Sequence, residues 1–205
     1  LAEWLDRWLN EYMIFTVRES TWVSYVVMCK NQINPHLGDK PIAFLTTADI
    51  QKFYNKIKKS GRKFPHPVLG HQLADSSVRR IHMMLHEAME TVRKERLIVK
   101  NPTDGTTIPK NNYPPKQILT EAQLDRFMDE LLADEPWRDF FYTELTTGLR
   151  LGEICGLRWS DLDEVSGRLK VSRTTGKKKG GVVTWGDTKT ETGMRTILLP
   201  PSTLE

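Results

Sequence analysis

The chain has 205 residues, of which 39% are hydrophobic and 27% charged, and its formal net charge is +4 at pH 7. This length allows two small domains, and no apolar run approaches the ~18 residues that a bilayer-spanning helix needs, so a soluble globular protein is expected. The two cysteines, Cys29 and Cys155, are far apart and lack C-x-x-C spacing, so they suggest neither a disulfide framework nor a zinc site and favour a reducing compartment.

Four amphipathic helices are expected in the first half of the chain, because apolar residues recur there at intervals of three and four. They begin at Leu1, at Ser20 or Thr21, at Thr46 and at Asp75 to Ser77. The third start is the most specific, since Thr46 with Asp49 three residues later is typical of a capping box. The sequence therefore predicts a helical bundle over residues 1–102.

The composition then changes, and residues 103–117 are rich in Pro, Gly, Asn and Thr without apolar periodicity, as in an interdomain linker. A second capping box, Thr120 with Gln123, begins a new helix with an apolar face that carries Leu124, Phe127, Met128 and Leu131. Further along, short apolar runs separated by Gly- and Lys-rich turns predict strands. We therefore expect a mainly α fold with a small β part (α+β), with the second domain at residues 118–205.

The segment Thr146 to Glu153 reads TTGLRLGE and places one arginine at a glycine-broken helix junction. Leu149 and Leu151 are expected to point inward, so Arg150 must lie at a pocket edge or pair with a buried anion. Glu153 shares a helical face with Arg150 and can orient its guanidinium group. From these residues alone, a structural Arg–Glu pair and a functional arginine both stay open.

Together with the following GLRWSDLD, this string resembles the first active-site box of the tyrosine recombinases, the family of phage and transposon integrases. Similar enzymes follow the box with a β-hairpin that bears a lysine, and Lys189 lies at the matching place before GMRTILLP. Residues 1 to about 100 resemble the core-binding domain of integrases from prophages and conjugative transposons. The resemblance thus covers nearly the whole chain, as a core-binding domain plus the N-terminal part of a catalytic domain.

This resemblance implies a site-specific DNA recombinase of a mobile genetic element, active in DNA integration or transposition. Such enzymes cut and rejoin strands through a 3′-phosphotyrosine intermediate, with no metal or nucleotide cofactor. Arg150 would neutralise the phosphate oxygens, Lys189 would protonate the leaving 5′-oxygen, and Glu153 would orient Arg150. The alternative for Lys189 is an exposed charge in a basic turn, where Lys177 to Lys179 are rivals for its role.

Three parts of the family pattern have no match here: the H-x-x-R motif, the later His or Trp, and the tyrosine nucleophile. All five histidines and all five tyrosines precede Arg150. Tyr12, Tyr25 and Tyr54 fall on apolar helical faces and are expected in the core. We therefore expect a fragment that does not cleave DNA by itself.

The expected partner is double-stranded DNA, and the resemblance implies a DNA-bound tetramer of the full-length protein in a bacterial cytoplasm, encoded by the bacterium or a phage, away from any membrane. Basic residues gather in the predicted hairpin and near helix starts, where phosphate contacts are possible. The expected DNA contacts are Arg18, Thr21, Lys30, Arg79, Arg80, His82, Lys110, Lys116, Arg173, Lys177, Lys178 and Lys179. Each of them is also explained singly as a solvated surface residue.

Two other functions stay open. A non-catalytic DNA-binding regulatory module would use Arg150 only to grip a phosphate. A helical protein-interaction adaptor is favoured if Trp4, Trp8 and Trp22 line an exposed groove instead of a core.

Overall fold

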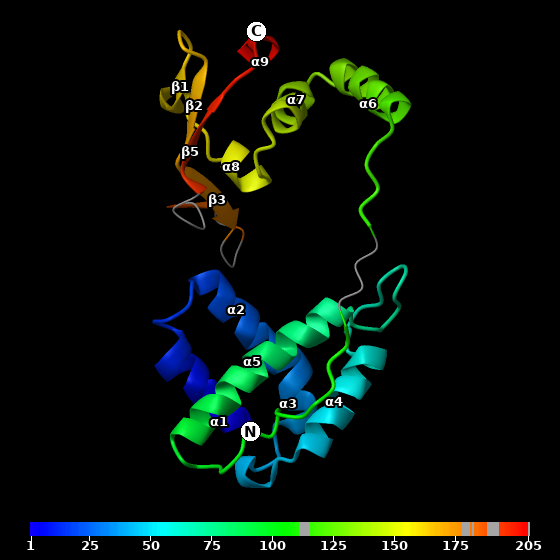
Figure 1. Ribbon diagram of the computed structural model, residues 1–205, viewed down its shortest axis with the longest axis vertical. Helices are drawn as coiled ribbons and strands as arrows, with labels where there is room; N and C mark the ends of the chain where they lie inside the picture. Colours follow the sequence, from blue (N-terminus) through cyan, green and yellow to red (C-terminus); the bar gives the residue numbers. More distant parts are fainter. Residues whose placement is uncertain (111–114, 178–180, 182, 188–192, 205) are drawn as a thin grey trace. The chain divides into compact units, whose positions relative to one another are not determined.

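A computed structural model of the chain (Figure 1) describes residues 1–110, 115–177, 181, 183–187 and 193–204, without the side chains of residues 177, 187, 201 and 202. The chain divides into two compact units, Leu1–Pro115 (unit 1) and Lys116–Glu205 (unit 2). Unit 1 is helical and unit 2 combines helices with short strands, which confirms the predicted mainly α fold with a small β part. The division into 1–102, a linker at 103–117, and 118–205 stays a prediction.

Unit 1 is a bundle in which two of the helical segments continue through a π-helical turn. Its elements are α1 (Ala2–Trp8) with η1 (Leu9–Met13), α2 (Glu19–Met28) with η2 (Cys29–Ile33) and α3 (Asn34–Leu37), the 3-10 turn η3 (Ile42–Phe44), α4 (Thr47–Ser60) and α5 (Asp75–Lys94). The helix start expected at Ser20 or Thr21 is wrong. Arg18 has the extended backbone of the N-cap position, so α2 already begins at Glu19. No described helix in either unit is long and apolar enough to span a bilayer.

Both predicted capping boxes are confirmed. Thr46 Oγ1 accepts a hydrogen bond from the Asp49 amide at 3.2 Å, and Asp49 Oδ2 accepts one from the Thr46 amide at 3.0 Å. The same reciprocal pair joins Thr120 and Gln123 at the start of α6. Each box satisfies backbone donors that the first helical turn would leave unpaired, so these helix starts are set locally.

The tryptophans of unit 1 lie in or against its core. Trp4 is 5% exposed and donates from Nε1 to the Ala88 carbonyl at 3.2 Å, while Trp8 is 0% exposed. Trp22 packs against the same core and donates to the Leu9 carbonyl at 2.9 Å. The exposed groove required by the adaptor interpretation is therefore not formed by these residues. The expected core positions of the tyrosines are confirmed as well, with Tyr54 buried and Tyr12 and Tyr25 packed against the core.

The first part of the predicted linker runs along unit 1. Thr103 is 1% exposed, and its amide donates to Asn101 Oδ1 at 3.0 Å. Further on, the Thr107 amide donates to Gln51 Oε1 at 2.7 Å, which ties the segment to α4. These contacts give the backbone of this stretch fixed hydrogen-bond partners although it lacks apolar periodicity.

Unit 2 has two small antiparallel sheets beside short helices. Its elements are α6 (Glu121–Ala133), α7 (Arg138–Thr147), α8 (Leu151–Ile154), the 3-10 turn η4 (Trp159–Asp161), β1 (Leu162–Asp163), β2 (Arg168–Val171), β3 (Arg173–Lys177), β4 (Val183–Asp187), β5 (Arg195–Leu198) and α9 (Pro201–Leu204). One sheet has the order β1-β2-β5, and β3 pairs with β4 in a hairpin. The buried apolar centre consists of Leu149, Leu169, Val171 and Leu199.

The apolar face predicted for α6 is only partly buried. Leu131 is 6% exposed, but Leu124 is 37% and Phe127 is 41% exposed. Within the described residues α6 packs chiefly on α7, so one neighbouring helix covers only part of the face. Much of this apolar face is therefore exposed in the described part of the chain.

Candidate functional site

The candidate site is the junction between α7 and α8. Gly148 ends α7 in the left-handed conformation at φ 63°, which glycine adopts without the steric cost that a side chain brings. The next residue, Leu149, is 3% exposed, and Arg150 follows with the extended backbone of the N-cap of α8. The expectation that Leu151 points inward is wrong: it is 63% exposed, because the first residue of α8 lies on the outer side of that single turn. Leu149 thus anchors the junction beside an exposed Arg150.

Glu153 is the buried centre of the site, and its carboxylate accepts four hydrogen bonds. Oε1 accepts from Arg150 Nη1 at 3.0 Å and from Arg195 Nη1 at 3.2 Å. Oε2 accepts from the Arg150 amide at 3.0 Å and from Arg195 Nη2 at 3.0 Å. The hydrogen bonds from Arg195 are the largest cause that lowers the pKa of Glu153 to about 2. Glu153 is therefore ionised at neutral pH, although its side chain is only 5% exposed.

The Arg150 side chain is 79% exposed, so its guanidinium group faces solvent while one N–H is fixed on Glu153. The predicted Arg150–Glu153 contact is confirmed, but the shared helical face is wrong: Arg150 has an extended backbone at the N-cap of α8, and Glu153 reaches back to it from the third helical position. The role of either residue in catalysis stays a prediction. Arg195 is a site residue that the sequence prediction missed. No sequence pattern distinguished Arg195, since it is one of several basic residues after position 167 and lies 42 residues from Glu153.

The β3–β4 hairpin is packed closely against α8. A Cβ atom on Gly152 would lie 2.5 Å from Thr174 Oγ1 and 2.8 Å from the Thr175 carbonyl oxygen, so only glycine fits without a shift. Arg173, at the start of β3, donates to both carboxylate oxygens of Asp161 at 2.7 and 3.0 Å. Arg173 was predicted to contact DNA, and here its guanidinium group ties β3 to the η4 turn.

Several predicted residues cannot be placed at the site. Lys178, Lys179 and Lys189 lie outside the described residues, and Lys177 is described only by its backbone at the end of β3. The structure therefore brings together Arg150 and Glu153, whereas Lys189, the predicted general acid, is not among the described residues.

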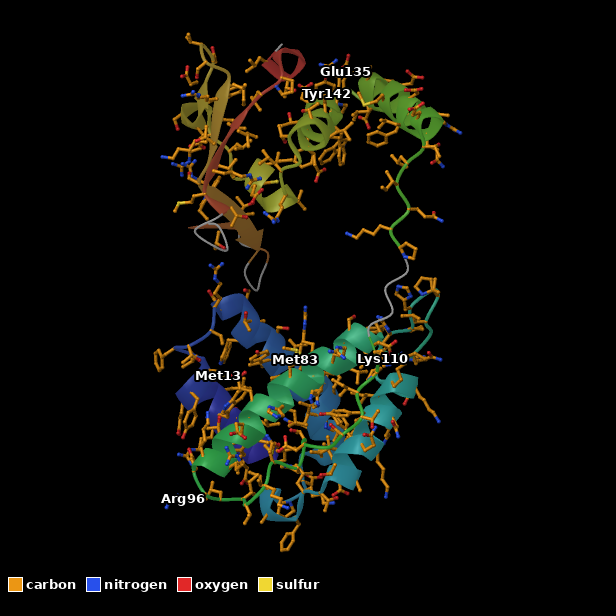
Figure 2. All side chains as sticks on the ribbon, in the orientation of Figure 1. Met13, Met83, Arg96, Lys110, Glu135 and Tyr142 are labelled. Carbon is orange, nitrogen blue, oxygen red and sulfur yellow. The ribbon has the colours of Figure 1, made fainter. Side chains whose placement is uncertain are left out.

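The predicted DNA contacts of unit 1 are mostly on its surface. Arg18, Lys30, Arg80 and Lys110 are exposed, with Lys110 labelled in Figure 2, and Lys116 is exposed at the start of unit 2. Thr21 is half-buried. Two others have partners within unit 1: Arg79 donates to the Pro109 carbonyl at 3.2 Å, and His82 Nδ1 lies 3.0 Å from the Tyr54 hydroxyl. Burial lowers the pKa of His82, which favours the neutral ring.

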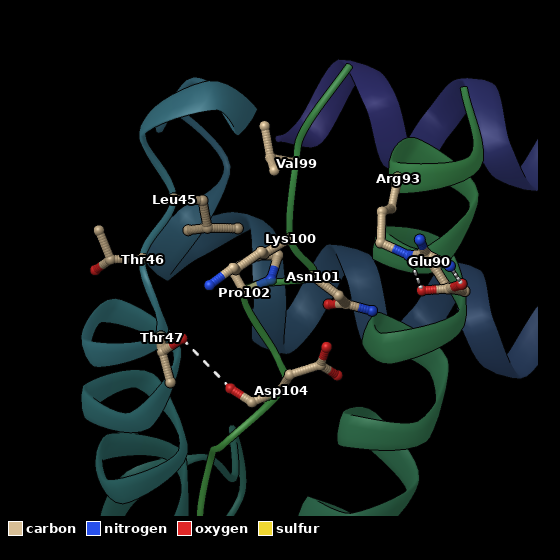
Figure 3. A pocket seen from close by; sticks show the side chains of 10 residues that line it. All are labelled: Leu45, Thr46, Thr47, Glu90, Arg93, Val99, Lys100, Asn101, Pro102 and Asp104. Carbon is tan, nitrogen blue, oxygen red and sulfur yellow. Dashed lines mark hydrogen bonds and ion pairs between the residues drawn. The ribbon is translucent and has the colours of Figure 1, made fainter. Parts of the chain in front are cut away.

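Figure 3 shows an open hollow of about 590 Å³ in unit 1, between the start of α4, the end of α5 and residues 99–104. Its polar groups pair with one another, since Arg93 Nε donates to Glu90 at 2.9 Å and Thr47 Oγ1 to the Asp104 carbonyl at 3.4 Å. Across the described part of the chain, no group of three or more His, Cys, Asp or Glu is placed to hold a metal ion. The junction at Arg150 is thus the stronger candidate.

Comparisons with known proteins find two family models. Residues 1–58 match the phage integrase N-terminal SAM-like domain, and residues 117–195 match the phage integrase family. A tyrosine recombinase XerC-like protein of Caldanaerobacter subterraneus subsp. tengcongensis is 26% identical over 181 residues, which cover 84% of this chain and 43% of the relative. An integrase of Mycobacterium phage FRAT1 is 24% identical over 204 residues, covering 98% of this chain and 55% of the relative.

Solved structures share the fold. The Tn1549 transposon integrase in complex with a circular intermediate DNA superposes with a TM-score of 0.84 at 22% identity, covering 99% of this chain and 62% of that one. A lambda integrase dimer bound to a COC′ core site gives a TM-score of 0.69 at 24% identity, covering 92% of this chain and 62% of that one. The chain spans about half the length of the curated relatives, with 43% and 55% for the two named above.

Proposed function

This chain belongs to the phage integrase family of tyrosine recombinases, and from that premise we propose that it is part of a site-specific DNA recombinase of a mobile element. The observation that carries the proposal is the exposed guanidinium group of Arg150, fixed through one N–H on the buried carboxylate of Glu153. In this proposal the protein cuts and rejoins DNA strands through a 3′-phosphotyrosine, and the tyrosine lies outside this chain.

The proposed chemistry uses arginine as an electrophilic anchor. Negative charge develops on the non-bridging oxygens of the scissile phosphate, and a planar guanidinium group can donate to two oxygens at once. Arg150 has this capacity because Glu153 occupies one of its guanidinium donors and the side chain remains 79% exposed. Lys189 is proposed as the acid that protonates the leaving 5′-oxygen, and Glu153 as the group that orients Arg150.

The proposal extends to partners and organisation. Residues 1–102 form a core-type DNA-binding domain, 103–117 a linker, and 118–205 the N-terminal part of a catalytic domain. Double-stranded DNA is the substrate, the full-length protein assembles as a tetramer on it, and it acts in the bacterial cytoplasm. Its proposed DNA contacts are the twelve residues predicted from the sequence; among them, Arg173 also ties β3 to the η4 turn through Asp161.

Trapping a covalent complex tests this function. The full-length protein is incubated with duplex DNA from the ends of its element, nicked so that the short strand bearing the 5′-hydroxyl diffuses away after cleavage. We expect a protein–DNA adduct that survives denaturation and carries the DNA through its 3′-phosphate, and no adduct with residues 1–205 alone. Salt-dependent binding of the same DNA without any adduct from the full-length protein would instead favour the regulatory module.

The basic run Lys177 to Lys179 provides a separate prediction about binding. Replacing the three lysines with alanine will weaken DNA binding and flatten its salt dependence, by a slope of about 0.9 for each phosphate that is no longer neutralised. The dissociation constant is measured by fluorescence anisotropy between about 50 and 200 mM salt. Replacing the exposed Lys94, in the last turn of α5, serves as a control for the removal of a surface charge. An unchanged slope in the triple variant removes this run from the interface.

A further inference from the structure

Arg195 and Arg150 share the Glu153 carboxylate unequally. Arg195 gives both terminal nitrogens to Glu153, at 3.2 Å to Oε1 and 3.0 Å to Oε2, and its Nη1 also lies 3.3 Å from the Gly193 carbonyl oxygen. Arg150 gives the carboxylate one guanidinium nitrogen and its backbone amide. The two arginines and one carboxylate leave the cluster with a net charge of +1, which is exposed chiefly on Arg150, 79% against 31% for Arg195.

We propose that Arg195 is a positioning residue of the strand-cleavage site: its two-pronged pair with Glu153 keeps that carboxylate from capturing the guanidinium fork of Arg150, which is thereby left for the scissile phosphate. The inference rests on the proposed function, since it assigns a task within the same site. It is argued from the hydrogen bonds that Arg150 and Arg195 each donate to the Glu153 carboxylate.

The physical argument starts from the hydrogen bonds that Glu153 needs. A carboxylate that is 5% exposed loses most of its hydration and must be satisfied by protein donors. Without Arg195 it would keep only two of its four hydrogen bonds, and Arg150 is then the remaining cation in contact with it among the described residues. Because arginine and carboxylate favour a two-pronged pair, Arg150 would rotate its fork onto Glu153 and the pair would become neutral. The rotation and the loss of net charge would both weaken the binding of a phosphate by Arg150.

Arg195 is well placed for this task because it comes from a sheet. In the antiparallel pairing of β2 and β5 it lies opposite Val171, which is 1% exposed. Thus β5 fixes the origin of the Arg195 side chain against the buried centre of unit 2, while Glu153 is fixed by α8. Groups held by such elements keep their mutual geometry better than groups on a loop.

The test uses the full-length protein, two substitutions of Arg195 and a control substitution of Arg168. Arg195→Gln should slow single-turnover cleavage of the nicked duplex by about tenfold or more, while the dissociation constant for DNA changes by less than roughly threefold. Arg195→Lys keeps a charge near Glu153 and should fall between Arg195→Gln and the unmodified protein. Arg168→Gln removes an exposed arginine from the neighbouring strand β2 and should cleave normally.

A second substitution separates positioning from a structural role. If Glu153 captures Arg150 once Arg195 is gone, then Arg195→Gln with Glu153→Gln removes the capturing charge and should cleave several times faster than Arg195→Gln alone. A structural role predicts the opposite, because the second change removes a further buried interaction. Normal cleavage by Arg195→Gln, or a double variant no faster than the single one, overturns the inference. If Arg195→Gln does not fold, normal cleavage by Arg195→Lys overturns the inference by itself.

The cleavage rates of Arg150 variants distinguish failure of this inference from failure of the proposed function. Normal cleavage after replacement of Arg150 would remove the recombinase site itself. Slow cleavage by an Arg150 variant, combined with normal cleavage by Arg195→Gln, would leave the proposed function standing and remove only the task assigned to Arg195.

Discussion

Replacing Arg150 with lysine will slow strand cleavage by about a hundredfold or more while most of the DNA affinity remains. Lysine keeps the positive charge that attracts DNA but presents one ammonium group in place of a planar fork, so it cannot donate to two phosphate oxygens in a fixed geometry. It also changes the side-chain contact to Glu153, which now joins Arg150 Nη1 and Glu153 Oε1 at 3.0 Å. The rate is measured as single-turnover formation of the covalent complex, at protein concentrations above the dissociation constant.

Arg126→Lys is the matched control, because Arg126 is exposed on α6 and the change is chemically the same. It should cleave at the rate of the unmodified protein. Equal rates for Arg150→Lys and the control would mean that this guanidinium group is structural. The recombinase assignment of the site would then fail even if DNA binding persisted.

Replacing Trp8 with alanine will lower the free energy of unfolding of unit 1 by roughly 3–5 kcal/mol. Trp8 is 0% exposed, its ring stacks on Tyr25 with centroids 6.0 Å apart, and its Nε1 donates to Thr91 Oγ1 at 3.2 Å. The change therefore empties a large volume between α1, α2 and α5 and removes a hydrogen bond as well. Urea denaturation followed by far-ultraviolet circular dichroism measures the destabilisation, because unit 1 contains the long helices α4 and α5.

A second tryptophan supplies the control for this measurement. Trp159 is 86% exposed on the η4 turn of unit 2, and Trp159→Ala should change stability by no more than about 0.5 kcal/mol. If Trp8→Ala shifted the urea midpoint no further than Trp159→Ala, Trp8 would not be part of the core of unit 1.

The helices of unit 1 could be predicted because their signals are local. The capping box of Thr46 and Asp49 and the apolar spacing of α5 each lie within a few turns of one helix, and both are present in the structure. The start of α2 was missed because Ser20 and Thr21 are good capping residues by composition, while the backbone places Arg18 at that position. Capping preference is a weak guide where several polar residues adjoin.

The apolar face of α6 illustrates a different limit. The pattern indicates which residues could be buried, but burial depends on a neighbouring element that covers them. Leu131 meets such a neighbour, whereas Leu124 and Phe127 stay more than a third exposed within the described residues. Periodicity therefore predicted the helix and not the extent of its burial.

By itself, the sequence determined the contact between Arg150 and Glu153, because a carboxylate three positions after a helix N-cap can reach back to that residue. Only the tertiary structure decided that Glu153 is shared with Arg195, 42 residues away. That contact depends on the register in which β5 pairs with β2, and a shift of one residue would turn the Arg195 side chain to the other face of the sheet. The Arg150–Glu153 contact follows from local spacing, whereas the Arg195–Glu153 contact follows from strand pairing, which no local pattern specifies.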